Sequence, residues 1–173
     1  MQQKFDKSTI FKAKQPHNIF LLNLALVHLL MAPATLILDA GISGLLVPLF
    51  ISLLTMLYSL LKIKTLNINK NKNWFIYAHW VLALNRYRLL MIAYCATLFL
   101  LLAGWLISIT SPDPNMQDII FTVFIRISIM PTLLLVLVNF FLESSALSMA
   151  AKGEIADSIV NKLPDNIKAQ INK

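Results

Sequence analysis

Residues 119–142 read IIFTVFIRISIMPTLLLVLVNFFL, a run in which Arg126 is the one charged residue. A helix rises 1.5 Å per residue, so about 20 apolar residues cross the ~30 Å hydrocarbon core of a bilayer. The run therefore predicts a transmembrane helix. Three further apolar runs predict the same structure, at residues 19–38, 45–61 and 89–109. We expect an all-α, polytopic membrane protein with four transmembrane helices.

The composition supports a membrane protein. Hydrophobic residues make up 58% of the chain and charged residues 13%, whereas soluble domains carry about a quarter charged residues. A soluble fold of this composition would expose too much apolar surface to stay dispersed. The single cysteine, Cys95, lies inside an apolar run and excludes an internal disulfide.

The distribution of charge predicts the orientation. Fourteen of the fifteen lysines and arginines lie in residues 1–17, 62–88 and 143–173. The intervening loops, 39–44 and 110–118, contain acidic residues and no basic residue. Since cytoplasmic loops are enriched in Lys and Arg, we expect both termini and the central loop in the cytoplasm. The Lys-, Asn- and Ile-rich polar segments suggest a bacterial source, where helical spans lie in the cell inner membrane.

The first apolar run has an alternative interpretation as a cleaved signal peptide. The segment before it is basic, and Ala32-Pro33-Ala34 faintly resembles a cleavage site. However, Pro33 stands inside that site and residues 36–38 continue the apolar run. We therefore expect the first span to be retained, within a membrane domain over residues 18–142.

The links predict two antiparallel helical hairpins. The turn 39–44 is short and contains Gly41 and Gly44, and glycine allows the backbone conformations of tight turns. The proline-rich loop 111–115 ends the third span. Within the cytoplasmic segment 62–88, a helix continuous with the third span would be about 54 Å long, which exceeds the hydrocarbon core.

We therefore expect an interfacial amphipathic helix before the third span, with a bend near residues 85–88. His79 and Arg86 are seven residues apart, so they lie on one stripe of that helix. With Arg88 they form a candidate lipid or partner site, the alternative being a polar stripe that faces the cytoplasm. In the cytoplasmic tail, 143–173, apolar residues at every fourth position predict a short helix that contacts a partner, the bilayer or solvent.

Arg126 is the basic residue that orientation leaves unexplained. It follows Asp118 by eight residues, or about 12 Å of helix. A charge inside the bilayer costs at least ~2.5 kcal/mol and usually has a partner. One interpretation is an arginine that extends to the headgroups or pairs with Asp39. The other is a site for an anionic ligand, a lipid headgroup or a partner's carboxylate. Pro131 removes the backbone bond to Ile127 and can kink the helix there.

His28 is the histidine that falls within a predicted span, and a bis-histidine haem needs two at similar depth. We therefore expect His28 and Asn23 to form hydrogen bonds between helices; ligation of a cofactor shared with another subunit is the alternative. The sequence contains no metal-ligand cluster, phosphate-binding glycine loop or catalytic triad pattern. We expect no metal, no cofactor and no nucleic-acid partner.

These features favour an accessory, scaffold or assembly subunit of a larger membrane complex, without catalysis of its own. Its partners would be membrane lipids and other membrane subunits. Two alternatives stay open: a small oligomeric transporter or channel that uses Arg126, and a redox or enzyme subunit that completes its site with another chain.

Overall fold

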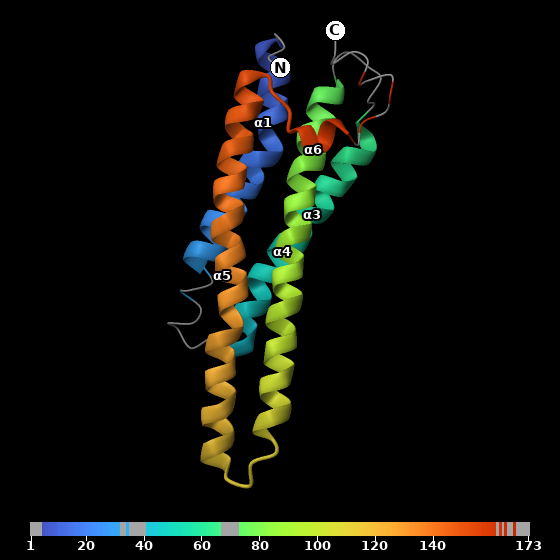
Figure 1. Cartoon of the computed structure of the whole chain (residues 1–173). Coiled ribbons are helices and arrows are strands. Elements are labelled where there is room, and N and C mark those ends of the chain that lie inside the picture. The colour runs from blue at the N-terminus through green and yellow to red at the C-terminus, as the bar shows by residue number, and fades with distance from the viewer. Residues whose placement is uncertain are drawn as a thin grey trace. The chain divides into compact units, whose positions relative to one another are not determined.

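The computed structural model describes residues 5–31, 34, 41–66, 73–161, 163, 165 and 168. All regular structure in these residues is helical, as the sequence predicts. The elements in chain order (Figure 1) are α1 (Lys7–Leu22), the π-helix η1 (Asn23–Met31), α3 (Gly41–Thr65), α4 (Asn73–Ser108), α5 (Pro114–Lys152) and α6 (Asp157–Val160).

Three helices are long and apolar enough to cross a membrane: Leu46–Thr65 in α3, Trp74–Ser108 in α4 and Pro114–Lys152 in α5. They indicate a multi-pass membrane protein. The predicted span 19–38 extends over residues outside the described part, so that span and the two-hairpin arrangement stay predictions. The turn expected at 39–44 is partly helical, because α3 already begins at Gly41.

The segment before the predicted third span differs from the expectation of a separate helix. Helix α4 runs without interruption for 36 residues, and no break occurs at residues 85–88. That stretch contains neither proline nor glycine, so nothing in its backbone ends the helix. Its aromatic residues Trp74, Trp80 and Tyr87 are buried against protein. These rings therefore contribute to the packing of the first unit.

The chain forms two compact units, which we describe separately. The first unit comprises residues 1–87 and 140–173. Asp6 caps the start of α1 by accepting a hydrogen bond from the backbone N–H of Thr9. The hydroxyls of Ser8 and Thr9 also donate to this carboxylate, which holds the pKa of Asp6 well below its ordinary value.

The C-terminal segment closes back onto the first unit. Helix α5 ends at Lys152, and Gly153 adopts a positive φ of 73° that glycine tolerates. Ile159 packs in a core cluster with Ala78, Leu82 and Ala146. Leu163 packs in another with Trp74, Phe75, Ala13 and Ala150. The apolar positions of the tail therefore contact α4 and α5.

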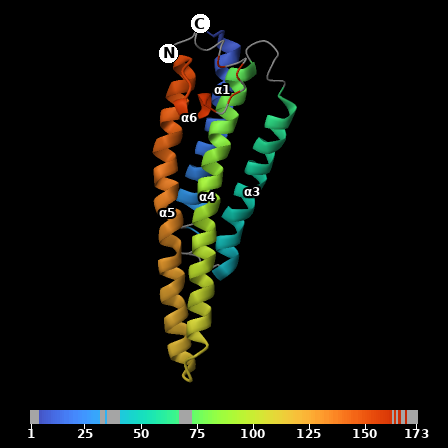
Figure 2. The same cartoon turned by 45° about the vertical axis from the view of Figure 1, so that its right-hand side comes forward.

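The second unit, residues 88–139, contains the remainder of α4 and α5 and the loop between them. The two segments lie side by side in both views (Figures 1 and 2). The Thr97 hydroxyl donates to the carbonyl of Ser128 at 2.7 Å and lies 2.8 Å from the Thr132 hydroxyl. Gly104 lies so close to Phe124 that a Cβ at Gly104 would come within 2.2 Å of the Phe124 Cβ.

We predict that Gly104→Ala destabilises the protein. Alanine normally favours a helix over glycine by up to about 1 kcal/mol. Here the added methyl meets a Cβ, which cannot turn away, and overpacking costs typically about 1–3 kcal/mol. Thermal unfolding in detergent should show a lower midpoint for Gly104→Ala. Leu102→Ala, at an exposed position of the same helix, is the control, and an unchanged midpoint for Gly104→Ala would contradict the close packing.

Candidate functional site: a buried polar cluster

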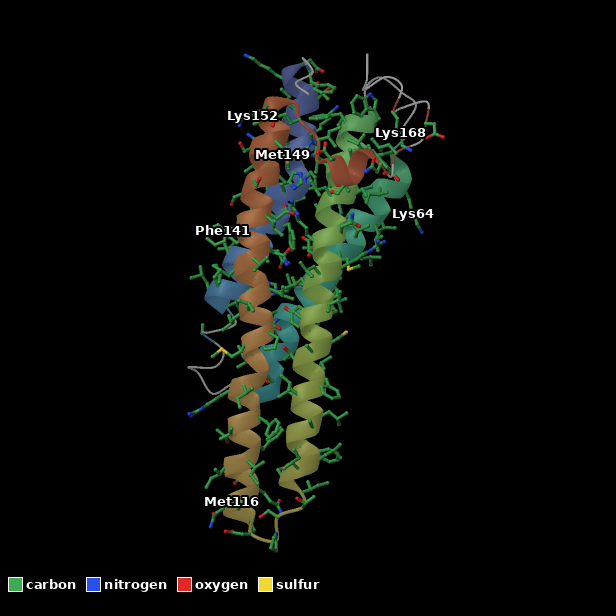
Figure 3. The ribbon with its side chains drawn as sticks, in the orientation of Figure 1. Lys64, Met116, Phe141, Met149, Lys152 and Lys168 are labelled. Carbon is green, nitrogen blue, oxygen red and sulfur yellow. The ribbon has the colours of Figure 1, made fainter. Side chains whose placement is uncertain are left out.

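Four polar side chains meet inside the first unit. They are His17 of α1, His79 and Arg86 of α4 and Glu143 of α5, which we call the polar cluster. His17 and Glu143 have no exposure, and His79 is 1% exposed. Phe141, two residues before Glu143, points away from these helices (Figure 3). The cluster therefore occupies the inward face of each helix.

The Glu143 carboxylate has a partner for each oxygen. Its Oε2 lies 2.6 Å from Nδ1 of His17, and its Oε1 accepts a hydrogen bond of 2.9 Å from Nη1 of Arg86. The same Arg86 nitrogen donates to the carbonyl of Leu142 at 2.6 Å. A buried carboxylate is costly unless it is paired and hydrogen-bonded. Here α1 and α4 each supply one partner, so the charge ties three helices together.

The second half of the cluster fixes the positions of the ring protons. Nε2 of His79 lies 3.1 Å from the carbonyl of Glu154, and a carbonyl only accepts, so this nitrogen carries a proton. With His79 neutral, its Nδ1 accepts the bond of 2.9 Å from Nε2 of His17. His17 thus donates from Nε2, which leaves its Nδ1 to face the Glu143 carboxylate.

One proton is therefore shared across the contact between His17 and Glu143. If it lies on Nδ1, His17 is an imidazolium paired with a carboxylate; if it lies on Oε2, both groups are neutral. The contact of 2.6 Å is short, as expected for the charge-assisted hydrogen bond of the imidazolium–carboxylate state. The cluster is thus able to hold a proton out of contact with solvent.

The groups at the two ends of this hydrogen-bond chain determine whether it can relay protons. One end is the backbone carbonyl of Glu154, which takes up no proton at ordinary pH. The other is Arg86, whose guanidinium stays protonated in proteins. A proton relay needs groups at both ends that exchange protons. The described geometry is accordingly that of a lock, by which we mean a set of hydrogen bonds that holds helices together. Through the carbonyl of Glu154 these bonds also hold the C-terminal segment.

The structure brings together some of the residues singled out in the sequence and separates others. His79 and Arg86 share one face of α4, as their spacing predicts, and this face meets His17 and Glu143. Arg88 is exposed and takes no part in the cluster. Arg126 is exposed in the second unit and makes no ion pair or side-chain hydrogen bond with described residues. Asp39, its suggested partner, lies outside the described residues.

His28 belongs to a second buried polar group. Its Nδ1 donates to the carbonyl of Asn23 at 3.1 Å, and its Nε2 lies 3.3 Å from the Ser52 hydroxyl of α3. The Asn23 amide also donates to Ser52 at 3.1 Å. These contacts join η1 to α3, in agreement with the expected hydrogen bonding between helices. Both ring nitrogens of His28 are engaged, as are those of His17 and His79.

Sequence reasoning missed Glu143 and His17. Glu143 stands directly after the predicted fourth span and was assigned to the tail, while His17 was assigned to the N-terminal segment. A signal was present, because Glu143 is the only acidic residue between Asp118 and Glu154. An isolated acid at the end of an apolar helix indicates a partner in another helix. The sequence alone does not say which base that partner is.

Comparison with protein-family models, with curated proteins and with solved structures finds no match to this chain. Within the described residues, no group of three or more His, Cys, Asp or Glu side chains is arranged to hold a metal ion. Inferences about function therefore rest on the geometry described above.

We predict that Glu143→Ala strongly destabilises the first unit. Removing one partner of a buried ion pair costs about 3–5 kcal/mol, because the remaining charge stays buried without compensation. Unfolding by urea in detergent should show this loss. Ser145→Ala, at an exposed position two residues further along α5, is the matched control and should stay within about 0.5 kcal/mol of the unmodified protein.

A double-mutant cycle checks that the effect comes from the pair. Arg86→Ala alone should also destabilise, and the double variant should lose less than the sum of the two single losses. The expected coupling is about 0.5–3 kcal/mol. Strictly additive losses would show that Arg86 and Glu143 do not stabilise each other.

Proposed function

We propose that this protein is an integral membrane accessory, scaffold or assembly subunit of a larger membrane complex, without catalysis of its own. The observation that supports the proposal is that the side chains best suited to acid–base chemistry form hydrogen bonds with one another. Both ring nitrogens of His17 and His79 and both carboxylate oxygens of Glu143 have partners within the chain. No atom of these groups is left to face a substrate.

A lock of this kind suits a scaffold. Helix association in a membrane lacks the hydrophobic driving force that acts in water, so interhelical hydrogen bonds and close packing hold helices in place. The polar cluster and the Asn23–His28–Ser52 group supply such bonds within the first unit. They leave the outward faces of the helices apolar, as in α3, where Phe50, Leu54 and Leu57 are exposed. Those faces can meet lipid or another membrane subunit.

The proposed location is a bacterial inner membrane, with both termini in the cytoplasm. Helix α1 begins and α5 ends at the same end of the first unit (Figure 1), and lysines flank both positions. Lys64 lies near the end of α3, and Lys152 at the end of α5 (Figure 3). This gathering of lysines is the pattern that cytoplasmic faces carry.

We predict that the protein co-purifies with other membrane proteins in a fixed ratio. The tagged full chain would be extracted from membranes of its source in a mild detergent and the bound chains identified by mass analysis. A tagged membrane protein of similar length and abundance is the control for non-specific carry-over. Purification of the chain alone, or only with copies of itself, would overturn the proposal.

The same preparation tests whether the polar cluster conducts protons. We predict no proton flux when the purified protein is reconstituted in vesicles with a pH gradient and a pH-sensitive dye inside. The reason is that the polar cluster ends on a carbonyl and a guanidinium. A flux that Glu143→Gln abolishes, with Ser145→Ala unchanged, would mean that the cluster is a proton path and not a lock.

A further inference from the structure

The second unit carries an exposed arginine beside an apolar groove. Arg126 is exposed on α5, within a span where the flanking residues are apolar. The groove is lined by seven side chains, six from α5 and one, Leu100, from α4. Met130, Leu134 and Leu137 of this lining are 66%, 63% and 49% exposed. Together with Arg126 they follow one stripe of the helix, at spacings of three or four residues.

We propose that this surface binds an anionic phospholipid, with the phosphate on Arg126 and one acyl chain along the groove. The dimensions fit. From Arg126 to Leu137 the helix rises about 16 Å, which is close to half of the ~30 Å hydrocarbon core. Side chains on a helix lean toward its N-terminus. The guanidinium therefore extends toward the loop at residues 109–113, and the apolar stripe runs the other way, toward the bilayer centre.

The charge of Arg126 favours an anion at this position. Arginine stays charged in a protein, and a charge inside the bilayer needs a counter-charge or hydration. A guanidinium matches the geometry of a phosphate through paired hydrogen bonds. The described residues of the second unit give Arg126 no partner, and the nearest acid along α5, Asp118, is about 12 Å away along the helix axis. A phosphate drawn to Arg126 supplies the missing charge.

The lining of the groove favours an acyl chain over a second helix. Helices that pack in membranes use small residues, which let the two backbones approach closely. The groove lining contains Leu, Ile, Met and Pro, and no Gly, Ala, Ser or Thr. Large flexible side chains such as Met130 adapt to a mobile hydrocarbon chain. A partner helix that carries a carboxylate would find no small residues in this lining against which to pack closely.

The test measures lipid bound to the purified full-length protein by mass spectrometry of the intact protein–lipid complex. Phosphatidylglycerol and phosphatidylcholine with identical acyl chains would be titrated separately, which isolates the headgroup charge. The unmodified protein should bind phosphatidylglycerol more tightly. Arg126→Gln should weaken this binding about tenfold, since a hydrogen bond between charged groups contributes roughly that much. Arg126→Lys keeps the charge and should retain part of the preference.

Two more variants separate the groove from the charge. Leu134→Trp fills the groove and should weaken the binding of both lipids, while Leu98→Trp, at an exposed position of α4 outside the groove, should leave it unchanged. Lys152→Gln removes an exposed positive charge elsewhere on α5 and should also have no effect. Thermal unfolding of each variant shows that it is folded. Leu134→Trp keeps the test valid if Arg126→Gln does not fold.

Three results would overturn the proposal. The first is equal binding of phosphatidylglycerol by Arg126→Gln and the unmodified protein. The second is full displacement of the lipid by inorganic phosphate, which would make the site one for a soluble anion. The third is the loss of a co-purifying protein from Arg126→Gln with lipid binding unchanged, which would make the occupant a partner's carboxylate.

Discussion

A carboxylate shielded from solvent must find a partner for each oxygen within the protein, and Glu143 finds one on each of two other helices. His17 of α1 lies at one oxygen and Arg86 of α4 at the other. Because the charge is buried, neither partner can be lost without a large penalty. The first unit is thus organised around the carboxyl group of Glu143, and His79 extends the network to the backbone of Glu154.

The second unit is held by a different principle. Its two helix segments meet through a hydroxyl contact at Thr97 and through the missing side chain of Gly104. These are the small-residue and hydroxyl contacts expected where the surrounding medium is hydrocarbon and burial of apolar groups yields little. The sequence contains only four glycines, and the one at position 104 allows the close approach of Phe124.

Much of the architecture follows from the sequence, because the length and hydropathy of a span are local properties. Apolar runs predicted the helices now seen as α3, the later part of α4 and α5. A separate interfacial helix was predicted because a helix continuous with the third span would be longer than the hydrocarbon core, but α4 is one continuous helix. The rings of Trp80 and Tyr87 lie in its first part. They are buried by α1 and α3, where Tyr87 packs on Phe20 and Trp80 on Tyr58. Whether a ring faces lipid or protein depends on neighbours distant in sequence.

The candidate site illustrates the same limit. The spacing of His79 and Arg86 predicted that they share one face of a helix. It could not predict the contact with Glu143, which is 57 residues from Arg86 along the chain. Only the tertiary structure identifies what a polar stripe faces. In the structure, His79 and Arg86 of this stripe contact His17 and Glu143.

The two arginines, Arg86 and Arg126, have the same charge but differ in their partners. Each lies in an apolar helix, and each needs a counter-charge or hydration because a guanidinium does not lose its proton. For Arg86 the partner is Glu143, at 2.9 Å within the same chain. The part of the chain described here gives Arg126 no such partner, so its charge must be met from outside that part. An internal partner makes an arginine a structural element, whereas an external one makes it a recognition element. On this reasoning Arg86 contributes to the packing of the first unit, whereas the role proposed for Arg126 in the second unit is recognition.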